Sequence, residues 1–336
     1  MSAMNNIMPM KTTNKNILGV GSIVLGLLIF SLQDIAVKWI GGSYPILEIV
    51  IFRGIVAMPI TLLFFRLEGG RGLPTTKQHK LEYVRGLFLF LSYTTYFMGL
   101  AALPLAEIAA IRFSAPLMIT ALSVRLLGEK VRLNRWVALG IGFIGVLLVV
   151  RPGSTNFNIG SIFILLSTLF YALSAMLTRR LQTTDSSATM AYYSSLVYLA
   201  AAAVLAPLTI AAGPTPNAPP SIAFLFHAWS VPTLLDLIVM SGLGWVWAGG
   251  MYFMAQAYSL ALASVVAPFE YVTLPINTMW GFVLWHQFPI LTTWVGAGLT
   301  LLSGLYALIQ DQKEVSKAVD LSMDEITASN YENADI

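Results

Sequence analysis

Seven ionisable side chains lie inside long apolar stretches of this sequence: Asp34, Lys38, Glu48, Arg53, Glu107, Arg112 and Glu270. An ionisable group in the middle of a membrane helix costs at least about 2.5–3.5 kcal/mol. Each of these groups therefore needs a partner or a water-filled cavity. Such residues are typical of substrate paths and gates, so they are the first candidates for a functional site.

Arg112 and Glu270 are the most informative of the seven, because they occupy corresponding positions of an internal repeat described below. A cation and an anion at equivalent depth can form a salt bridge or hold the two charges of a zwitterionic substrate. Aromatic residues flank both of them, namely Phe113, Phe269 and Tyr271. We expect the pair to serve substrate binding or gating, and a purely structural lock is the alternative.

The other ionisable residues have a structural interpretation beside the functional one. Asp34 and Lys38 are four residues apart, so they share a helix face and can form an ion pair or a charged lip of the substrate path. Arg53 stays protonated and can lock its helix to Asp34 or Glu48, or contact substrate. We expect Glu48 and Glu107 to be hydrated, because they lie close to one membrane interface.

Aromatic residues deep in the apolar stretches can pack the interior or line a stacking pocket for a ligand. These residues are Tyr93, Tyr96, Trp245, Tyr252 and Trp280.

Pro116, Pro268 and Pro275 lie within apolar stretches. Each frees a backbone carbonyl and predicts either a gate or a tolerated kink.

The composition requires a membrane. Of the 336 residues, 57% are hydrophobic and only 10% are charged, and the mean hydropathy is +0.75. A soluble domain carries roughly 25% charged residues, so lipid must surround most of this chain. Cysteine is absent, which excludes disulfides and thiolate chemistry. No phosphate-binding GxxxxGK[ST] loop, HExxH motif or G-x-S-x-G motif occurs, so we expect no catalytic residue, metal or cofactor.

The spacing of the apolar stretches predicts an all-α polytopic membrane protein with ten transmembrane helices. The predicted spans are 17–40, 46–66, 83–103, 106–127, 134–151, 160–180, 188–211, 234–257, 262–284 and 291–310. Continuous apolar runs, rather than alternating residues, argue against a β-barrel.

The basic residues predict the orientation of the chain. With the N-terminus in the cytoplasm, fifteen of the nineteen Lys and Arg residues lie on the cytoplasmic side and two on the other. Such an asymmetry indicates that both termini are cytoplasmic, in the inner (plasma) membrane. It also explains the net charge of +3 without nucleic acid as a partner. The acidic tail 311–336 is expected to be solvated.

The two halves of the chain carry similar patterns. Tyr96-Phe97-Met98 recurs as Tyr252-Phe253-Met254, and Gly-rich spans follow in both halves. The alignment places residue 112 opposite residue 270. We therefore divide the chain into a segment 1–16, two repeats at 17–151 and 152–310, and the tail 311–336. Five spans per repeat is an odd number, so the repeats are inverted, as in many secondary transporters.

These features resemble the EamA family of the drug/metabolite transporter superfamily. The resemblance rests on Ser31-Leu32-Gln33-Asp34, Arg53 and the stretch 104–153. That stretch contains Ser114-Ala115-Pro116, Gly128-Glu129-Lys130 and Arg151-Pro152-Gly153. In the second half, His286-Gln287 replaces the usual Gly-Glu pair. The opening of the first span is also similar to proteins of the group that takes up S-adenosylmethionine or riboflavin.

The resemblance implies a secondary transporter for a small metabolite, such as an amino acid, S-adenosylmethionine or a riboflavin-like compound. Its partners would be the substrate and the lipid bilayer, and a homodimer is compatible with the sequence. The alternatives are a membrane-embedded enzyme that modifies a lipid or metabolite, and a channel. The inverted repeat with unlike charges at equivalent depth favours a carrier over both.

Overall fold

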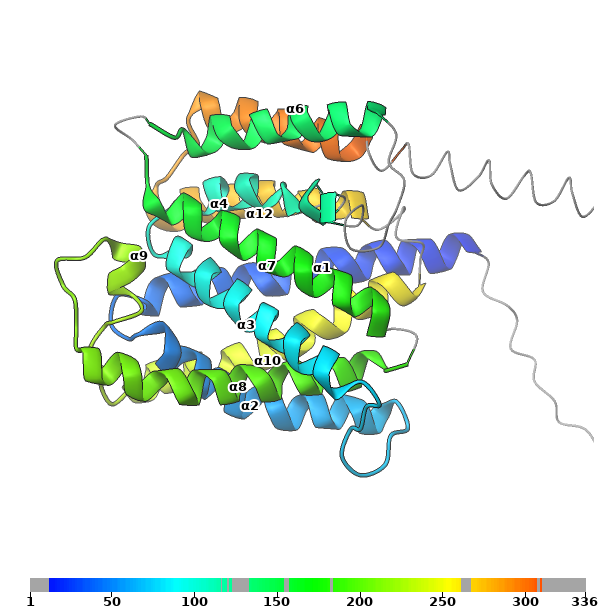
Figure 1. Cartoon of the computed structure of the whole chain (residues 1–336), viewed down its shortest axis with the longest axis vertical. Helices are drawn as coiled ribbons and strands as arrows, with labels where there is room; N and C mark the ends of the chain where they lie inside the picture. Colours follow the sequence, from blue (N-terminus) through cyan, green and yellow to red (C-terminus); the bar gives the residue numbers. More distant parts are fainter. Residues whose placement is uncertain are drawn as a thin grey trace, which may run out of the picture.

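The computed structural model describes residues 12–115, 117–119, 121–122, 133–153, 157–181, 184–260, 267–306 and 309. Within these ranges the chain is helical and contains no strand. Figure 1 shows the helices side by side in one bundle, with α6 and the 291–306 helix along one edge and α2 and α8 along the opposite edge. The protein is an all-α, multi-pass membrane protein.

The helix bounds follow the predicted spans closely in most places. In the first half they are α1 (Thr12–Ile40), α2 (Ile46–Leu67), α3 (His79–Leu100), α4 (Leu105–Arg112) and α6 (Leu133–Val150). In the second half they are α7 (Ile159–Leu181), α8 (Ser187–Ala212), α9 (Pro220–Ala223), α10 (Leu234–Leu260), the 3₁₀ helix η1 (Ala267–Val272), α12 (Thr273–Trp285) and the helix 291–306. The short helix α9 was not predicted.

Five of these helices have the length and the apolar composition to cross a membrane on their own. They are Ile17–Ile40, Ile46–Leu67, Ile159–Thr178, Ala188–Ala212 and Leu234–Met254. Many of their large apolar side chains point outward, as expected for residues that contact lipid rather than water. Val204, Leu208 and Ile238 are examples, and Trp245, which we expected inside, is 64% exposed.

Two predicted spans are interrupted. The span predicted at 106–127 ends its first helical segment at Arg112, and a turn follows at Phe113 and Ser114. The span predicted at 262–284 starts in its described part as the 3₁₀ helix η1 and becomes an α-helix only at Thr273. Pro116 lies outside the described residues.

The helices pack in reciprocal pairs. Helix α3 lies against α7 and α8, and α1 lies against α10. Helix α2 contacts both α8 and α10, and α4 contacts α12 and α7. Loops 68–78 and 213–233 lie at opposite ends of the bundle (Figure 1). We name the two ends after these loops, the 68–78 end and the 213–233 end.

One pair of helices makes direct backbone contact. A Cβ added to Gly145 on α6 would lie 2.6 Å from the carbonyl oxygen of Gly296, and one on Gly296 would lie 2.5 Å from that of Gly145. The Oγ1 of Thr300 also donates to the Gly142 carbonyl at 3.3 Å. Gly145 and Gly296 therefore permit the close approach of the two helices, whereas Gly140 and Gly298 face open space.

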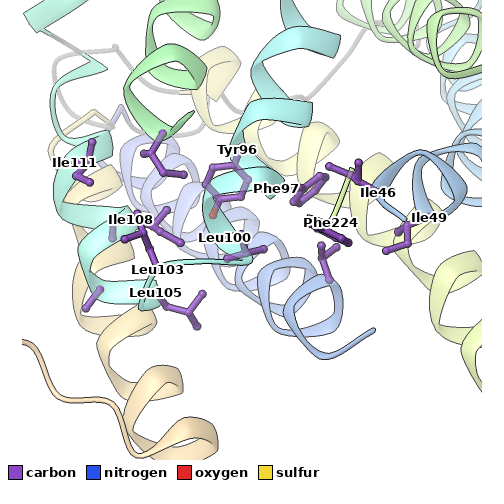
Figure 2. Packing of buried hydrophobic residues seen from close by; sticks show 14 of the residues in the cluster. Ile46, Ile49, Tyr96, Phe97, Leu100, Leu103, Leu105, Ile108, Ile111 and Phe224 are labelled. Carbon is purple, nitrogen blue, oxygen red and sulfur yellow. The ribbon is translucent and has the colours of Figure 1, made fainter. Parts of the chain in front are cut away.

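The largest buried cluster joins both halves near the 213–233 end. It includes Tyr96, Phe97 and Leu100 of α3, and Ile108 and Ile111 of α4. Figure 2 shows these side chains together with Ile46 and Ile49 of α2 and Phe224 beside α9. This cluster holds α3 and α4 in place, and these helices carry the candidate residues Tyr93, Tyr96, Glu107 and Arg112.

Candidate functional site

Tyr96 connects two charged residues inside the bundle. Its hydroxyl donates a 2.7 Å hydrogen bond to the Oδ2 of Asp34, so α3 is tied to α1. The guanidinium carbon of Arg112 lies 4.9 Å from the centroid of the same ring, so α4 also meets this point. Asp34 and Arg112 act electrostatically on each other, and the buried Asn277 of α12 acts on the same carboxylate. We call Asp34, Tyr96 and Arg112 the central cluster.

Arg112 and Glu270 border a common region that contains Tyr171 of α7. Both charges act electrostatically on this tyrosine. Each charge also lies beside a helix end that suits it: Arg112 is at the C-terminus of α4, and Glu270 precedes the N-terminus of α12. The partial negative charge of a helix C-terminus favours a cation, and the N-terminus favours an anion. The interruptions of both spans therefore fall at the candidate charges.

A series of alternating charges leads from the central cluster towards the 213–233 end. Lys38 interacts electrostatically with both Asp34 and Glu107. The Nη2 of Arg151 lies 3.0 Å from the Oε1 of Glu107 in an ion pair. The order of charges is thus Arg112, Asp34, Lys38, Glu107 and Arg151, with the sign changing at each step.

Two predictions for these residues are wrong. Lys38 does not pair directly with Asp34, because its ammonium donates instead to the backbone carbonyls of Leu100 and Leu103, where α3 ends. Glu107 is mostly buried rather than hydrated, because Arg151 from the end of α6 covers and pairs it.

Glu48 is also buried, at 2% exposure, where hydration was expected. The backbone of Ser230 forms a hydrogen bond with the Glu48 carboxylate. In the same region the hydroxyl of Tyr44 donates to Asp236 at 2.7 Å. This hydrogen bond raises the pKa of the Tyr44 phenol, which lies in the connection between α1 and α2.

Arg53 lies in an aromatic box rather than beside a carboxylate. Its Nη1 donates to the Oε1 of Gln33 at 3.0 Å, so its partner on α1 is Gln33 and not Asp34. Its guanidinium carbon lies 4.7–5.8 Å from four ring centroids, those of Tyr93, Phe97, Tyr198 and Trp247. The box combines side chains from α3, α8 and α10.

The remaining aromatic candidates divide into two groups. Phe113 packs edge-on against Tyr271, with ring centroids 4.8 Å apart, and the indole nitrogen of Trp280 donates to Ser31 at 3.1 Å. These residues join α12 and η1 to α4 and α1. Tyr252 and Phe269 lie at the surface instead, and Tyr252 is 44% exposed and packs against Phe64. The structure does not place them in the central cluster.

A second polar group lies at the 68–78 end. The Nη2 of Arg85 donates to Glu82 Oε2 at 2.9 Å, to Ser194 Oγ at 2.7 Å and to the Met190 carbonyl. Nearby, Thr76 donates to Asp185 at 2.7 Å. Arg85 is one of the fifteen basic residues that predict the orientation, and it also joins the start of α3 to α8.

Five residues near the candidate charges were missed from the sequence: Gln33, Tyr171, Tyr198, Trp247 and Asn277. Asn277 offered a signal, because it is a polar amide in an apolar span. Within the described ranges, no group of three His, Asp or Glu side chains has the arrangement of a metal site.

A bundle of apolar helices with charged side chains at two interrupted spans is typical of secondary transporters. Residues 17–151 match the EamA-like transporter family. The chain is 26% identical over 302 residues to the S-adenosylmethionine uptake transporter of Rickettsia bellii, covering 90% of this chain and 97% of the relative. It is 25% identical over 261 residues to the riboflavin transporter of Vibrio cholerae, covering 77% and 81%. Residues 17–151 thus belong to the EamA-like transporter family of the drug/metabolite transporter superfamily, and the chain is a small-metabolite transporter.

A solved crystal structure shares the fold. Its TM-score is 0.57, with 17% identity, and the match covers 88% of this chain and 98% of that chain.

Proposed function

We propose that this protein is a secondary transporter that carries a small zwitterionic metabolite with an aromatic part through a central cavity by alternating access. The observation that carries this proposal is the placement of Arg112 and Glu270 beside Tyr171, with Asp34 and Tyr96 next to Arg112. Interrupted helices that present charges near the midplane are a recurring way to build a substrate site.

The chemistry of the site favours one substrate class. Arg112 can bind a carboxylate in bidentate geometry, and Glu270 or Asp34 can bind an ammonium or sulfonium group. The rings of Tyr93 and Tyr171 can stack against a planar base. S-adenosylmethionine has all three features, so it is the first substrate to test, followed by riboflavin and free amino acids.

Reciprocal packing supports the proposed inverted repeats 17–151 and 152–310. Helix α1 lies on α10 as α7 lies on α3, and α2 contacts α10 as α8 contacts α3. The contacts are therefore unchanged when α1 is exchanged with α7, α2 with α8 and α3 with α10. Two such repeats can rock against each other around a fixed site.

We place both termini in the cytoplasm, in the inner (plasma) membrane of the cell. Support comes from the fifteen basic residues on one side against two on the other. Reporter domains fused after the last residue should be active in the cytoplasm. Activity only outside the cytoplasm would contradict this orientation.

Counterflow in proteoliposomes tests the function directly. Vesicles loaded with unlabelled S-adenosylmethionine should transiently accumulate the labelled compound, because a carrier exchanges the two. A channel gives equilibration without an overshoot, and an enzyme gives a chemically altered product. Either result would overturn the proposal. An overshoot with riboflavin or an amino acid but not with S-adenosylmethionine would keep the carrier and replace the substrate.

A further inference from the structure

A small cavity lies beside Arg53, between α2, α8 and α10. Its volume is about 10 Å³, and it is lined by Arg53, Gly54, Ala57, Ser195, Tyr198 and Trp247. A cavity of this size holds one particle of about the size of a water molecule. It is separate from the central cluster, which contains none of these residues.

The charge beside this cavity lacks a counter-ion in the described part of the chain. Arg53 is 3% exposed, so its cationic guanidinium lies out of contact with solvent. Its hydrogen-bond partner is the neutral amide of Gln33, and its other close neighbours are the aromatic faces of the box. Across the described ranges no Asp or Glu forms an ion pair with it. A buried charge without a counter-ion is costly, so an anion at this point would stabilise the structure.

Two hydroxyl groups on the cavity wall also lack an acceptor for their protons. The Oγ of Ser195 and the Oη of Tyr198 are buried, and both residues are only 4% exposed. The oxygen of Tyr198 interacts with the Arg53 guanidinium, which can only donate. They are three positions apart on α8, so they share one face of that helix. A buried hydroxyl without a partner is unfavourable, and both groups can donate to an acceptor placed in the cavity.

We propose that this cavity binds one small monovalent anion of halide size, such as chloride. The guanidinium of Arg53 would supply the opposite charge, and the hydroxyls of Ser195 and Tyr198 would donate to the anion. Carboxylate, sulfate and phosphate groups have at least three heavy atoms and exceed the space available. The bound ion would link α2 to α8 and α10, which belong to different proposed repeats. This proposal is independent of the substrate.

The test compares anions with the purified full-length protein in detergent at constant ionic strength. A ligand that binds the folded state raises the melting temperature in proportion to the logarithm of its concentration above Kd. Chloride and bromide should therefore raise the melting temperature by an amount that keeps growing with the logarithm of their concentration above Kd. Gluconate, acetate and sulfate should not. Crystals soaked in bromide should show an anomalous peak beside Arg53.

Two variants test whether the rise in melting temperature comes from an ion in this cavity. The double variant Ser195→Ala with Tyr198→Phe removes both hydroxyls but keeps Arg53, and it should weaken the apparent halide affinity about tenfold or more. The matched control is Thr94→Val, which removes another buried hydroxyl without a partner that does not line this cavity. The control should respond to chloride as the unmodified protein does.

Three results would overturn the proposal. Equal melting temperatures in chloride and gluconate, with no bromide peak beside Arg53, would mean that the cavity holds only water. An unchanged chloride response in the double variant would place the ion elsewhere. An equal response to sulfate would indicate a general salt effect rather than a site.

Discussion

Tyr96 donates its hydroxyl proton to Asp34 at 2.7 Å while its ring lies under the guanidinium of Arg112. One side chain thus separates an anion on α1 from a cation on α4, and it contacts both. We expect a substrate that binds either charge to disturb the contacts of this tyrosine. The relationship connects the packing of α1, α3 and α4 to the proposed transport site.

The first prediction removes that hydrogen bond and keeps the ring. Tyr96→Phe removes one of the donors to the buried Asp34 carboxylate, and a hydrogen bond to a charged group contributes about 1.5–3 kcal/mol. We expect the counterflow rate to fall about tenfold or more. The control is Tyr252→Phe on the exposed face of α10, which should keep the normal rate. Equal rates in the two variants would show that the Tyr96 hydroxyl has no role in transport.

The second prediction concerns the 68–78 end. Arg85→Ala leaves the buried Glu82 without its cation, and removal of one partner of a buried pair costs about 3–5 kcal/mol. The melting temperature of the purified protein should therefore fall clearly. Lys80→Ala, an exposed substitution on the same helix, should change stability by no more than about 0.5 kcal/mol.

A double variant separates the orphaned charge from lost packing. Replacing Glu82 by Leu and Arg85 by Met removes both charges, so it should recover most of the stability lost in Arg85→Ala. If the double variant were less stable than the single one, the explanation by an uncompensated charge would be wrong.

The third prediction tests the contact between α6 and the helix 291–306. Gly145→Ala would place a Cβ 2.6 Å from the Gly296 carbonyl oxygen, so the helices must separate. Overpacking of this kind costs about 1–3 kcal/mol. Gly140→Ala on the same helix meets no atom within 4 Å and should be neutral or stabilising by about 0.5–1 kcal/mol. Thermal unfolding measures both, and equal melting temperatures would contradict the close contact.

The sequence predicted the bounds of the helices better than it predicted which side of each helix points into the bundle. Apolar length defines a span, so the bounds of α2 and α8 lie close to expectation. Which side of a helix is buried depends on the helices that pack against it. Trp245 and Trp247 are two residues apart on α10, so they lie on nearly opposite sides of the helix, and only Trp247 reaches Arg53.

Contacts with other helices also explain why some predicted interaction partners were wrong. Helical spacing placed Lys38 within reach of Asp34, but the free carbonyls at the end of α3 come from a different helix and attract the ammonium. Tyr171 could not be found from the sequence, because its importance comes from charges on α4 and η1 that fold against α7.

The most direct test of the central claim is the counterflow rate of Arg112→Ala and of Glu270→Gln, measured per amount of protein reconstituted into vesicles. Both variants should insert, elute as a single species and lose at least about a hundredfold of the rate, because charged hydrogen bonds to the substrate disappear. Arg71→Ala in the exposed loop 68–78 is the matched control and should transport normally. Normal rates in both Arg112→Ala and Glu270→Gln would contradict the account, since neither charge would then take part in transport.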